Sequence, residues 1–287
     1  MKSIRLFLPL PVIAALFMIS GMPFVACTKT HTDYITRDST VYVRDTTVLD
    51  DTVYDYTSGM IAYYNFNGGN LNDSSGYQND ITFSNATLTS DRYGRPNNAY
   101  LFNGSSSYMS VPSSPSLNSP DNLTIYAIIK INGFYTGTFH ANLIVMKGYD
   151  YANGMYNLSF IDTPNDAPQV DTASEYLNGT YGDNDTQVNT VIDLGFMTTS
   201  HVSVGNWYRV AFTYDGMYVK LYINGVLEGT QRGTPPFTPN STNLYIGAQM
   251  DPSTLYPYWY NGVIDEIRIY NRALPAEAVA QLSNLTD

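Results

Sequence analysis

The segment Trp207–Glu228 reads WYRVAFTYDGMYVKLYINGVLE, and its pattern decides the fold class. Apolar and polar side chains alternate on both sides of Asp215-Gly216, and a second turn dipeptide, Asn224-Gly225, follows seven residues later. Alternation with a period of two residues is typical of β-strands that bury one face. Asp-Gly and Asn-Gly between such runs are strong signals for tight hairpin turns. The segment therefore predicts consecutive antiparallel strands joined by short turns.

The same kind of short apolar run, bounded by turn residues, recurs on both sides of this segment, at Met60–Phe66, Leu244–Gly247 and Gly262–Tyr270. The chain of 287 residues contains 26 Tyr, 21 Gly and 15 Pro, whereas only 14% of its residues are charged. This composition favours strands and turns and excludes a helical bundle or coiled coil. Pro275–Leu282 carries the one helical pattern. We therefore predict an all-β fold over residues 59–287, an antiparallel sandwich with one short C-terminal helix.

The charge balance restricts the kind of partner. Fourteen Lys and Arg face 25 Asp and Glu, which gives a formal net charge of -11. Nucleic-acid binding requires clustered basic residues that neutralise phosphates. The sequence therefore argues against a nucleic-acid partner.

The first 26 residues have the pattern of a secretory signal peptide. Lys2 and Arg5 precede an apolar run over residues 6–19, and small residues follow it. The alternative is a transmembrane helix. Pro and Gly interrupt the segment, however, and its uninterrupted apolar part is shorter than the ~20 residues that a membrane span requires. We therefore interpret residues 1–26 as a signal peptide.

Cys27 is the only cysteine, so the chain has no disulfide framework. The tetrapeptide Phe24-Val25-Ala26-Cys27 resembles a bacterial lipobox, with Phe24 where Leu is usual. The resemblance implies cleavage before Cys27, lipid attachment to it, and a location in the cell envelope, at the outer membrane or cell surface. Residues 27–58 contain a degenerate, acidic Asp-Thr-Val repeat. We interpret them as a tether with an extended conformation, in which the Thr and Val alternation is also compatible with a strand.

Six motifs occur in an order that resembles a known family: Tyr63–Gly68, Asn72–Gly76, Ala99–Tyr108, Trp207–Ala211, Leu221–Gly225 and Ile264–Leu274. Together they are similar to the laminin G-like domain of the concanavalin A-like lectin/glucanase superfamily. This resemblance implies a jelly-roll sandwich of two antiparallel sheets. The polar stretch Tyr149–Ser203 is enlarged relative to the family pattern. We expect long loops there, and loops of this kind often carry binding specificity.

The superfamily includes glucanases, which use two carboxylates that flank the scissile bond. Ile264–Ile267 contains Asp265 and Glu266 but lacks the flanking Glu residues of laminarinase-type enzymes. Asp183 and Asp185 lie in an Asn- and Gly-rich loop, where a solvated pair is expected. No Gly-x-Ser-x-Gly elbow occurs, and the three His residues have no metal-ligand spacing. We therefore predict no catalytic residue, and a glycan-cleaving enzyme stays an alternative.

Asp265 is predicted to point into the core, because it alternates with apolar residues of its strand. A buried carboxylate must be paired or coordinated. The family's pairing of its terminal strands would bring Asp265 near the loop that supplies Asn67, Asp73 and Asn79 or Asp80, whose oxygens suit Ca²⁺. We predict a structural calcium site with Asn67, Asp73 and Asp265 as ligands. In the alternative, Asp265 accepts backbone hydrogen bonds from the turn at residues 73–76.

The densest aromatic cluster, Tyr256-Pro257-Tyr258-Trp259-Tyr260, lies just before the last strand. Aromatic faces stack on sugar rings, so we predict that Tyr256, Tyr258, Trp259 and Tyr260 bind a ligand. The alternative is packing within the sandwich, a common use of Tyr. The predicted function is non-catalytic binding of a polysaccharide or glycoconjugate by a surface-anchored lipoprotein. A protein-protein adhesion module is the first alternative, and a glycoside hydrolase is the second.

Overall fold

The computed structural model describes residues 30–37, 40–47, 54–118, 121–135, 141–148, 155–161, 174–182, 191–192, 201–232, 240–250 and 257–285. The predictions for the signal peptide, Cys27, Tyr256 and the Asp183 and Asp185 pair fall outside these residues. The chain divides into two units, Met1–Tyr54 and Asp55–Asp287. Among the described residues, no helix is long and apolar enough to cross a membrane.

The described residues of the N-terminal unit form one hairpin. Strands β1 (Thr30–Arg37) and β2 (Thr40–Thr47) pair antiparallel along their whole length, with Thr30 opposite Thr47 and Arg37 opposite Thr40. A two-stranded hairpin by itself has marginal stability in water. This part of the predicted tether therefore forms two strands that pair with each other, and its role as a tether stays a prediction.

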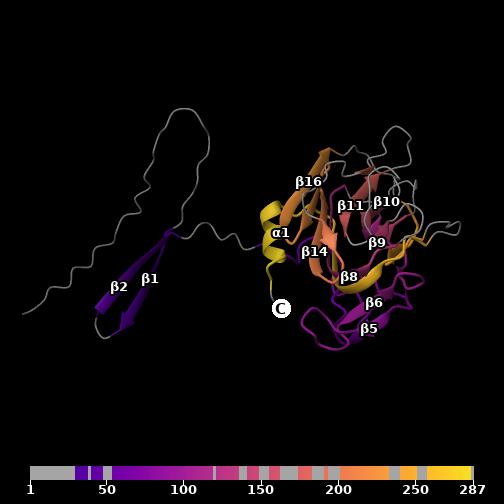
Figure 1. The fold of residues 1–287 in the computed structure, drawn as a ribbon. Coiled ribbons are helices and arrows are strands. Elements are labelled where there is room, and N and C mark those ends of the chain that lie inside the picture. Colours follow the sequence, from indigo (N-terminus) through magenta and orange to yellow (C-terminus); the bar gives the residue numbers. More distant parts are fainter. Residues whose placement is uncertain are drawn as a thin grey trace, which may run out of the picture. The chain divides into compact units, whose positions relative to one another are not determined.

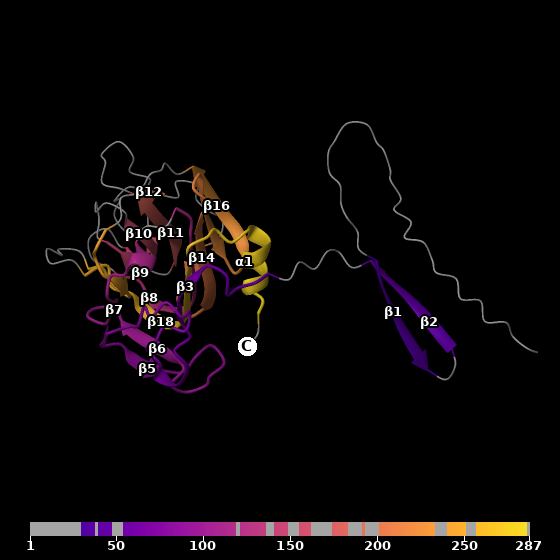
Figure 2. The same ribbon diagram turned by 180° about the vertical axis from the view of Figure 1, so that it is seen from behind.

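The second unit is a sandwich of two eight-stranded antiparallel sheets in the described part of the chain (Figures 1 and 2). Sheet I has the order β12-β11-β10-β9-β17-β7-β4, with β13 beside β11. Its strands are β4 (Phe83–Ser84), β7 (Met109–Val111), β9 (Asn142–Lys147), β10 (Met155–Ile161), β11 (Ser174–Gly182), β12 (Val191–Ile192), β13 (Val202–Ser203) and β17 (Leu244–Ile246).

Sheet II has the order β16-β15-β14-β8-β18-β6-β5, with β3 paired to β18. Its strands are β3 (Met60–Tyr64), β5 (Thr87–Thr89), β6 (Ala99–Asn103), β8 (Leu123–Gly133), β14 (Trp207–Tyr214), β15 (Tyr218–Ile223), β16 (Val226–Arg232) and β18 (Asn261–Tyr270). Helix α1 (Ala276–Leu282) follows β18, and two single-turn 3₁₀ helices span Asn67–Gly69 and Pro115–Leu117. The predicted all-β antiparallel sandwich with one short C-terminal helix is confirmed.

The hairpins predicted from Trp207–Glu228 form as expected. Strand β14 pairs with β15, and β15 pairs with β16. The Asp215 carboxylate accepts hydrogen bonds from the backbone N–H groups of Met217 (3.0 Å) and Tyr218 (2.6 Å). At the second turn, Asn224 and Gly225 have left-handed backbones with φ of 51° and 80°. Such a pair of positive φ values gives the tight turn whose twist matches the flanking strands.

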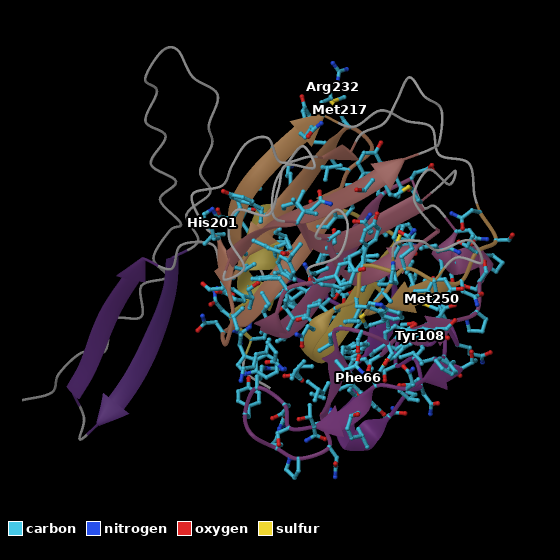
Figure 3. All side chains as sticks on the ribbon, turned by 45° about the vertical axis from the view of Figure 1, so that its right-hand side comes forward. Phe66, Tyr108, His201, Met217, Arg232 and Met250 are labelled. Atoms are coloured by element: carbon cyan, nitrogen blue, oxygen red, sulfur yellow. The ribbon has the colours of Figure 1, made fainter. Side chains whose placement is uncertain are left out.

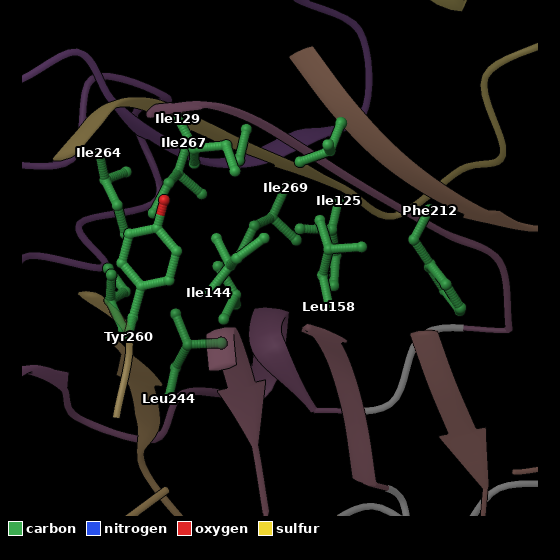
Figure 4. Close-up of a cluster of buried hydrophobic side chains, with 14 of the residues drawn as sticks. Ile125, Ile129, Ile144, Leu158, Phe212, Leu244, Tyr260, Ile264, Ile267 and Ile269 are labelled. Atoms are coloured by element: carbon green, nitrogen blue, oxygen red, sulfur yellow. The ribbon is translucent and has the colours of Figure 1, made fainter. Parts of the chain in front are cut away.

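The inner faces of the two sheets form one hydrophobic core (Figure 4). Ile125, Ile129, Ile264, Ile267 and Ile269 of sheet II face Ile144, Leu158 and Leu244 of sheet I, with Tyr260 at one side. These side chains are almost completely buried. Each contributes about 1.5–3 kcal/mol relative to an exposed position. Burial of the inward-facing, alternate residues of both sheets thus stabilises the sandwich.

Several of the many tyrosines are core residues that tie loops to the sandwich. The hydroxyl of Tyr64 donates to the carbonyl of Asn79 (2.6 Å), and that of Tyr156 donates to the carbonyl of Leu117 (3.0 Å). Burial raises the pKa of both phenols, because the charged form loses its solvation. A high tyrosine content is therefore partly structural in this protein.

The first and last segments of the sandwich are joined directly. The Arg272 guanidinium donates to the carbonyls of Ser58 (2.7 Å) and Asp55 (2.5 Å), and the Tyr56 hydroxyl donates to the carbonyl of Ala278 in α1 (3.2 Å). Strand β3 pairs antiparallel with β18, with Met60 opposite Tyr270. The chain therefore enters and leaves the sandwich at neighbouring points.

Candidate binding surface

The predicted aromatic cluster does not present its described members together. Tyr258 is 6% exposed and packs with Leu143, Met146 and Met155. Tyr260 is 1% exposed, and its hydroxyl donates to the carbonyl of Lys130 (3.0 Å). These two tyrosines therefore serve the packing role that we held as the alternative. Trp259, between them, is half-buried.

Trp259 belongs to a different group of aromatic residues, which we call the aromatic surface: Phe83, Tyr108, Tyr245 and Trp259. The ring centroid of Tyr108 lies 4.7 Å from that of Phe83 and 6.4 Å from those of Tyr245 and Trp259. Phe83 is 43% exposed, and the other three side chains are half-buried. Tyr108 is at the centre of the group, and Figure 3 labels it. These rings come from four separate segments of the chain.

Strand alternation and register place Phe83 and Tyr245 on the outer face of sheet I. In β17, Leu244 and Ile246 point into the core, so Tyr245 between them points outward. Ser110 of β7 is opposite both Tyr245 and Phe83 in the strand register. Directly opposed residues of an antiparallel pair share a face. Phe83, Ser110 and Tyr245 therefore form one row across the outer face.

Backbone hydrogen bonds hold Tyr108. Its N–H donates to the side-chain oxygen of Asn85 (2.7 Å), and its carbonyl accepts from the Asn85 N–H (3.3 Å). The Asn85 amide group also donates to the carbonyl of Ser106 (3.0 Å). Asn85 thus fixes the backbone of the central residue of the aromatic surface.

Trp259 is held through its two neighbours. The carbonyl of Tyr258 accepts from the N–H of Leu143 (3.0 Å), and the N–H of Tyr260 donates to the carbonyl of Gly247 (2.9 Å). Tyr258 has a left-handed backbone with φ of 48°. A non-glycine residue in this region costs on the order of 1–3 kcal/mol and persists only where the surrounding structure imposes it. The segment is therefore built to fix Trp259 between two buried side chains.

Sheet I carries two charged residues in its described strands, Lys147 and Glu175, and both are 0% exposed. Lys147 is opposite the core residues Leu244 and Tyr156, so it points inward. Its ammonium group donates to the carbonyl of Thr242 (2.5 Å) and the hydroxyl of Ser113 (3.3 Å), and burial lowers its pKa to about 8.

Glu175 is the second of these residues, and its carboxylate accepts a hydrogen bond from the Asn142 amide (2.7 Å). Because Lys147 and Glu175 are both fully buried, the outer face of sheet I has no exposed charge in its described strands.

Sheet II carries buried ion pairs. Asp265 occupies a bulge, because the register of β18 with β8 shifts between Ile264 and Glu266. Its carboxylate accepts from the guanidinium (2.8 Å) and the backbone N–H (3.1 Å) of Arg92. Burial raises the pKa of Asp265, and the Arg92 cation offsets part of this effect. The next residue, Glu266, pairs with Arg268 at 2.5 Å.

Asp265 is thus paired, as a buried carboxylate must be, and its partner is Arg92. The partner is neither the loop that supplies Asn67 and Asp73 nor the turn at residues 73–76. Arg92 is 173 positions away in the sequence, and no motif or spacing connects the two residues. The only signal available was that Asp265 needed some partner.

The other predicted calcium ligands have separate roles. The Asp73 carboxylate accepts hydrogen bonds from Tyr63 N–H (2.8 Å), Ser75 N–H (2.8 Å) and hydroxyl (2.7 Å), and Asn79 N–H (3.1 Å), which closes its turn. Asn67 is exposed at the start of a 3₁₀ helix. Within the described ranges, no three His, Cys, Asp or Glu side chains gather as a metal site would require. Asp73 and Asp265 already have protein donors, and calcium binding stays a prediction.

The two packed antiparallel sheets and the order of their strands define a jelly-roll sandwich of the lectin type. Residues 103–280, more than half of the chain, match the concanavalin A-like lectin/glucanases superfamily, and the protein belongs to this superfamily. The predicted family is thereby confirmed at the level of the superfamily. No curated protein sequence matches the chain.

Similar solved structures include domain 4 of AbnA, an extracellular GH43 arabinanase from Geobacillus stearothermophilus, in complex with arabinotriose. The TM-score is 0.56 and the identity 22%, over 78% of this chain and 98% of that domain. A second similar structure is that of botulinum neurotoxin type C, a toxin whose cell entry depends on interaction with two ganglioside molecules. Its TM-score is 0.54 and its identity 17%, over 79% of this chain. This chain spans 51% of that structure. At these identities the likeness shows the fold.

Proposed function

We propose that the sandwich is a non-catalytic carbohydrate-binding domain and that the aromatic surface is its contact with sugar rings. The observation that carries the proposal is the gathering of Phe83, Tyr245 and Trp259 around Tyr108 on an outer sheet face. Exposed aromatic rings offer a flat apolar face that matches the C–H face of a sugar, and the amide and hydroxyl groups beside them suit sugar hydroxyls. The arabinotriose complex of a similarly folded domain supports the proposal.

Tyr108→Ala and Trp259→Ala should each weaken glycan binding about tenfold, which corresponds to about 1.4 kcal/mol, because each removes a stacking face. A glycan array followed by calorimetry on the best ligand measures the effect. Tyr77→Ala is the matched control, since Tyr77 is a 51% exposed tyrosine outside the aromatic surface. Unchanged affinity in both variants, with normal melting temperatures, would refute this assignment. A folded protein that binds no glycan would favour the protein-adhesion alternative.

We also propose that the protein is a lipoprotein of the cell envelope, anchored through Cys27 after removal of residues 1–26. The support for this proposal is the lipobox resemblance of the sequence. A Cys27→Ser variant should lose incorporation of labelled palmitate and move from the membrane fraction to the soluble fraction. Labelling that survives the substitution would show that the lipid is attached at another residue and would overturn the assignment to Cys27.

A further inference from the structure

We infer that the ligand of the aromatic surface is an uncharged, soluble glycan chain, and neither an acidic polysaccharide nor a crystalline polysaccharide surface. This inference rests on the proposed function and deepens it. It follows from two independent observations on sheet I, the absence of outward charge on its described strands and the mutual inclination of the rings.

The strands beside the rings carry no charged side chain. Phe83 is in β4, Tyr108 directly precedes β7, and Tyr245 is in β17, and none of these strands contains a charged residue. Elsewhere in the described strands of sheet I, Lys147 and Glu175 are fully buried. Recognition of a carboxylate or sulfate normally uses Arg or Lys in charge-assisted hydrogen bonds. An anionic sugar on this face would lose solvation without gaining such a partner.

Neutral hydrogen-bonding groups lie beside the rings instead. The Asn243 amide donates to the hydroxyl of Ser110 (3.2 Å), which is in the row between Phe83 and Tyr245. Asn85, which holds Tyr108, is exposed. Amides and hydroxyls both donate and accept, as sugar hydroxyls do. The net charge of -11 acts in the same direction, because it opposes the approach of a polyanion.

The ring angles argue against a flat ligand. The Tyr108 ring is inclined by 32° to Phe83, 46° to Trp259 and 60° to Tyr245. No single plane can therefore lie against all four rings, as the face of a crystal would have to. A single glycan chain that turns from one sugar to the next can present its rings at such different angles. The geometry thus favours a soluble chain that is twisted or bent.

The test compares three classes of probe on the full-length protein and on the Trp259→Ala variant. The soluble neutral polysaccharides are arabinan, galactan, mixed-linkage glucan and carboxyl-reduced polygalacturonate. The acidic ones are heparin and polygalacturonate, which differs from its carboxyl-reduced form only in its carboxylates. Microcrystalline cellulose is the insoluble one. We expect one or more neutral chains to bind, with an affinity that changes less than about twofold between low and high salt, since no ion pair is screened. Acidic chains should bind at least tenfold more weakly, and cellulose should not retain the protein.

The outcomes separate this inference from the proposed function. Tighter binding of polygalacturonate than of its carboxyl-reduced form, a strong loss of affinity in salt, or retention on cellulose would overturn the inference. If that binding is still lost in Trp259→Ala, the proposed carbohydrate-binding role of the aromatic surface stands. If no probe of any class binds the folded protein, the proposed function fails and the inference fails with it.

Discussion

Gly262→Ala should destabilise the protein by more than about 4 kcal/mol, or prevent folding, the largest effect that we expect from a single methyl group. A Cβ at this position would lie only 2.1 Å from the carbonyl oxygen of Lys130 and 2.9 Å from the Tyr260 hydroxyl. The Lys130 oxygen is backbone, so it cannot rotate away as a side chain would. Gly262 is in β18 opposite Ile131 of β8, at a register shift in the central pairing of sheet II. Relief of the clash would separate these two strands.

Urea unfolding of the variant measures this effect, with Gly205→Ala as the control. Gly205 has φ of 91°, and no atom lies within 4 Å of its added Cβ. Its substitution should therefore cost only the backbone strain of a left-handed residue, about 1–2 kcal/mol. Equal unfolding midpoints for the two variants would show that the close approach of Gly262 to Lys130 does not constrain the fold.

Arg92→Leu should cost about 3–5 kcal/mol, because it leaves the Asp265 carboxylate buried without its partner. The side chains of Arg92 and Asp265 are 7% and 4% exposed. The double variant Arg92→Leu/Asp265→Leu should recover most of this loss, since it removes both charges. Recovery of stability in the double variant would show that the ion pair matters. If the two side chains contributed only by packing, the losses from the two single substitutions would add.

The pH dependence of Arg92→Leu has a definite sign. Burial already raises the pKa of Asp265, and loss of Arg92 removes the group that offsets it. A folded pKa above the unfolded value of about 3.9 means that the folded state binds the proton more tightly. The unfolding free energy of the variant should therefore fall as the pH rises through the folded pKa of Asp265 and should be restored below about 3.9. A pH profile parallel to that of the wild type would contradict this assignment.

The same unfolding curves, recorded with calcium and with EDTA, test the calcium prediction. A site that includes Asp265 would make calcium stabilise the wild type and not Asp265→Leu, since a ligand that binds only the folded state raises its stability. Identical curves with and without the metal would overturn the prediction.

The sequence predicted the elements that depend on neighbouring residues. Asp215-Gly216 and Asn224-Gly225 specify their turns locally, and alternation on either side specifies the strands, so both hairpins of β14–β16 were predictable. The aromatic surface was not predictable, because it joins Phe83, Tyr108 and Tyr245 from segments that are distant in the sequence. Alternation in β17 predicts that Tyr245 faces outward, but only the strand register brings it beside Tyr108.

The predicted aromatic cluster differs from the aromatic surface of the structure for a similar reason. Tyr258, Trp259 and Tyr260 are adjacent in the sequence, yet they point to three different environments. Tyr258 packs on the outer face of sheet I, Tyr260 enters the core, and Trp259 alone joins the aromatic surface. A local cluster of aromatic residues does not show which of them will be buried, since burial depends on Leu143, Met146 and other distant residues.

The junction of the first and last segments has a mechanical consequence. Because Met60 and Tyr270 are opposed at one end of the antiparallel β3–β18 pair, tension applied between the two segments would unzip these strands one hydrogen bond at a time. Shearing, which loads all hydrogen bonds together, would require tension applied at opposite ends of the pair. The contact of Tyr56 with Ala278 in α1 and those of Arg272 with Ser58 and Asp55 would carry that tension first. The sandwich is therefore mechanically weak when stretched between its two ends, whatever its thermodynamic stability.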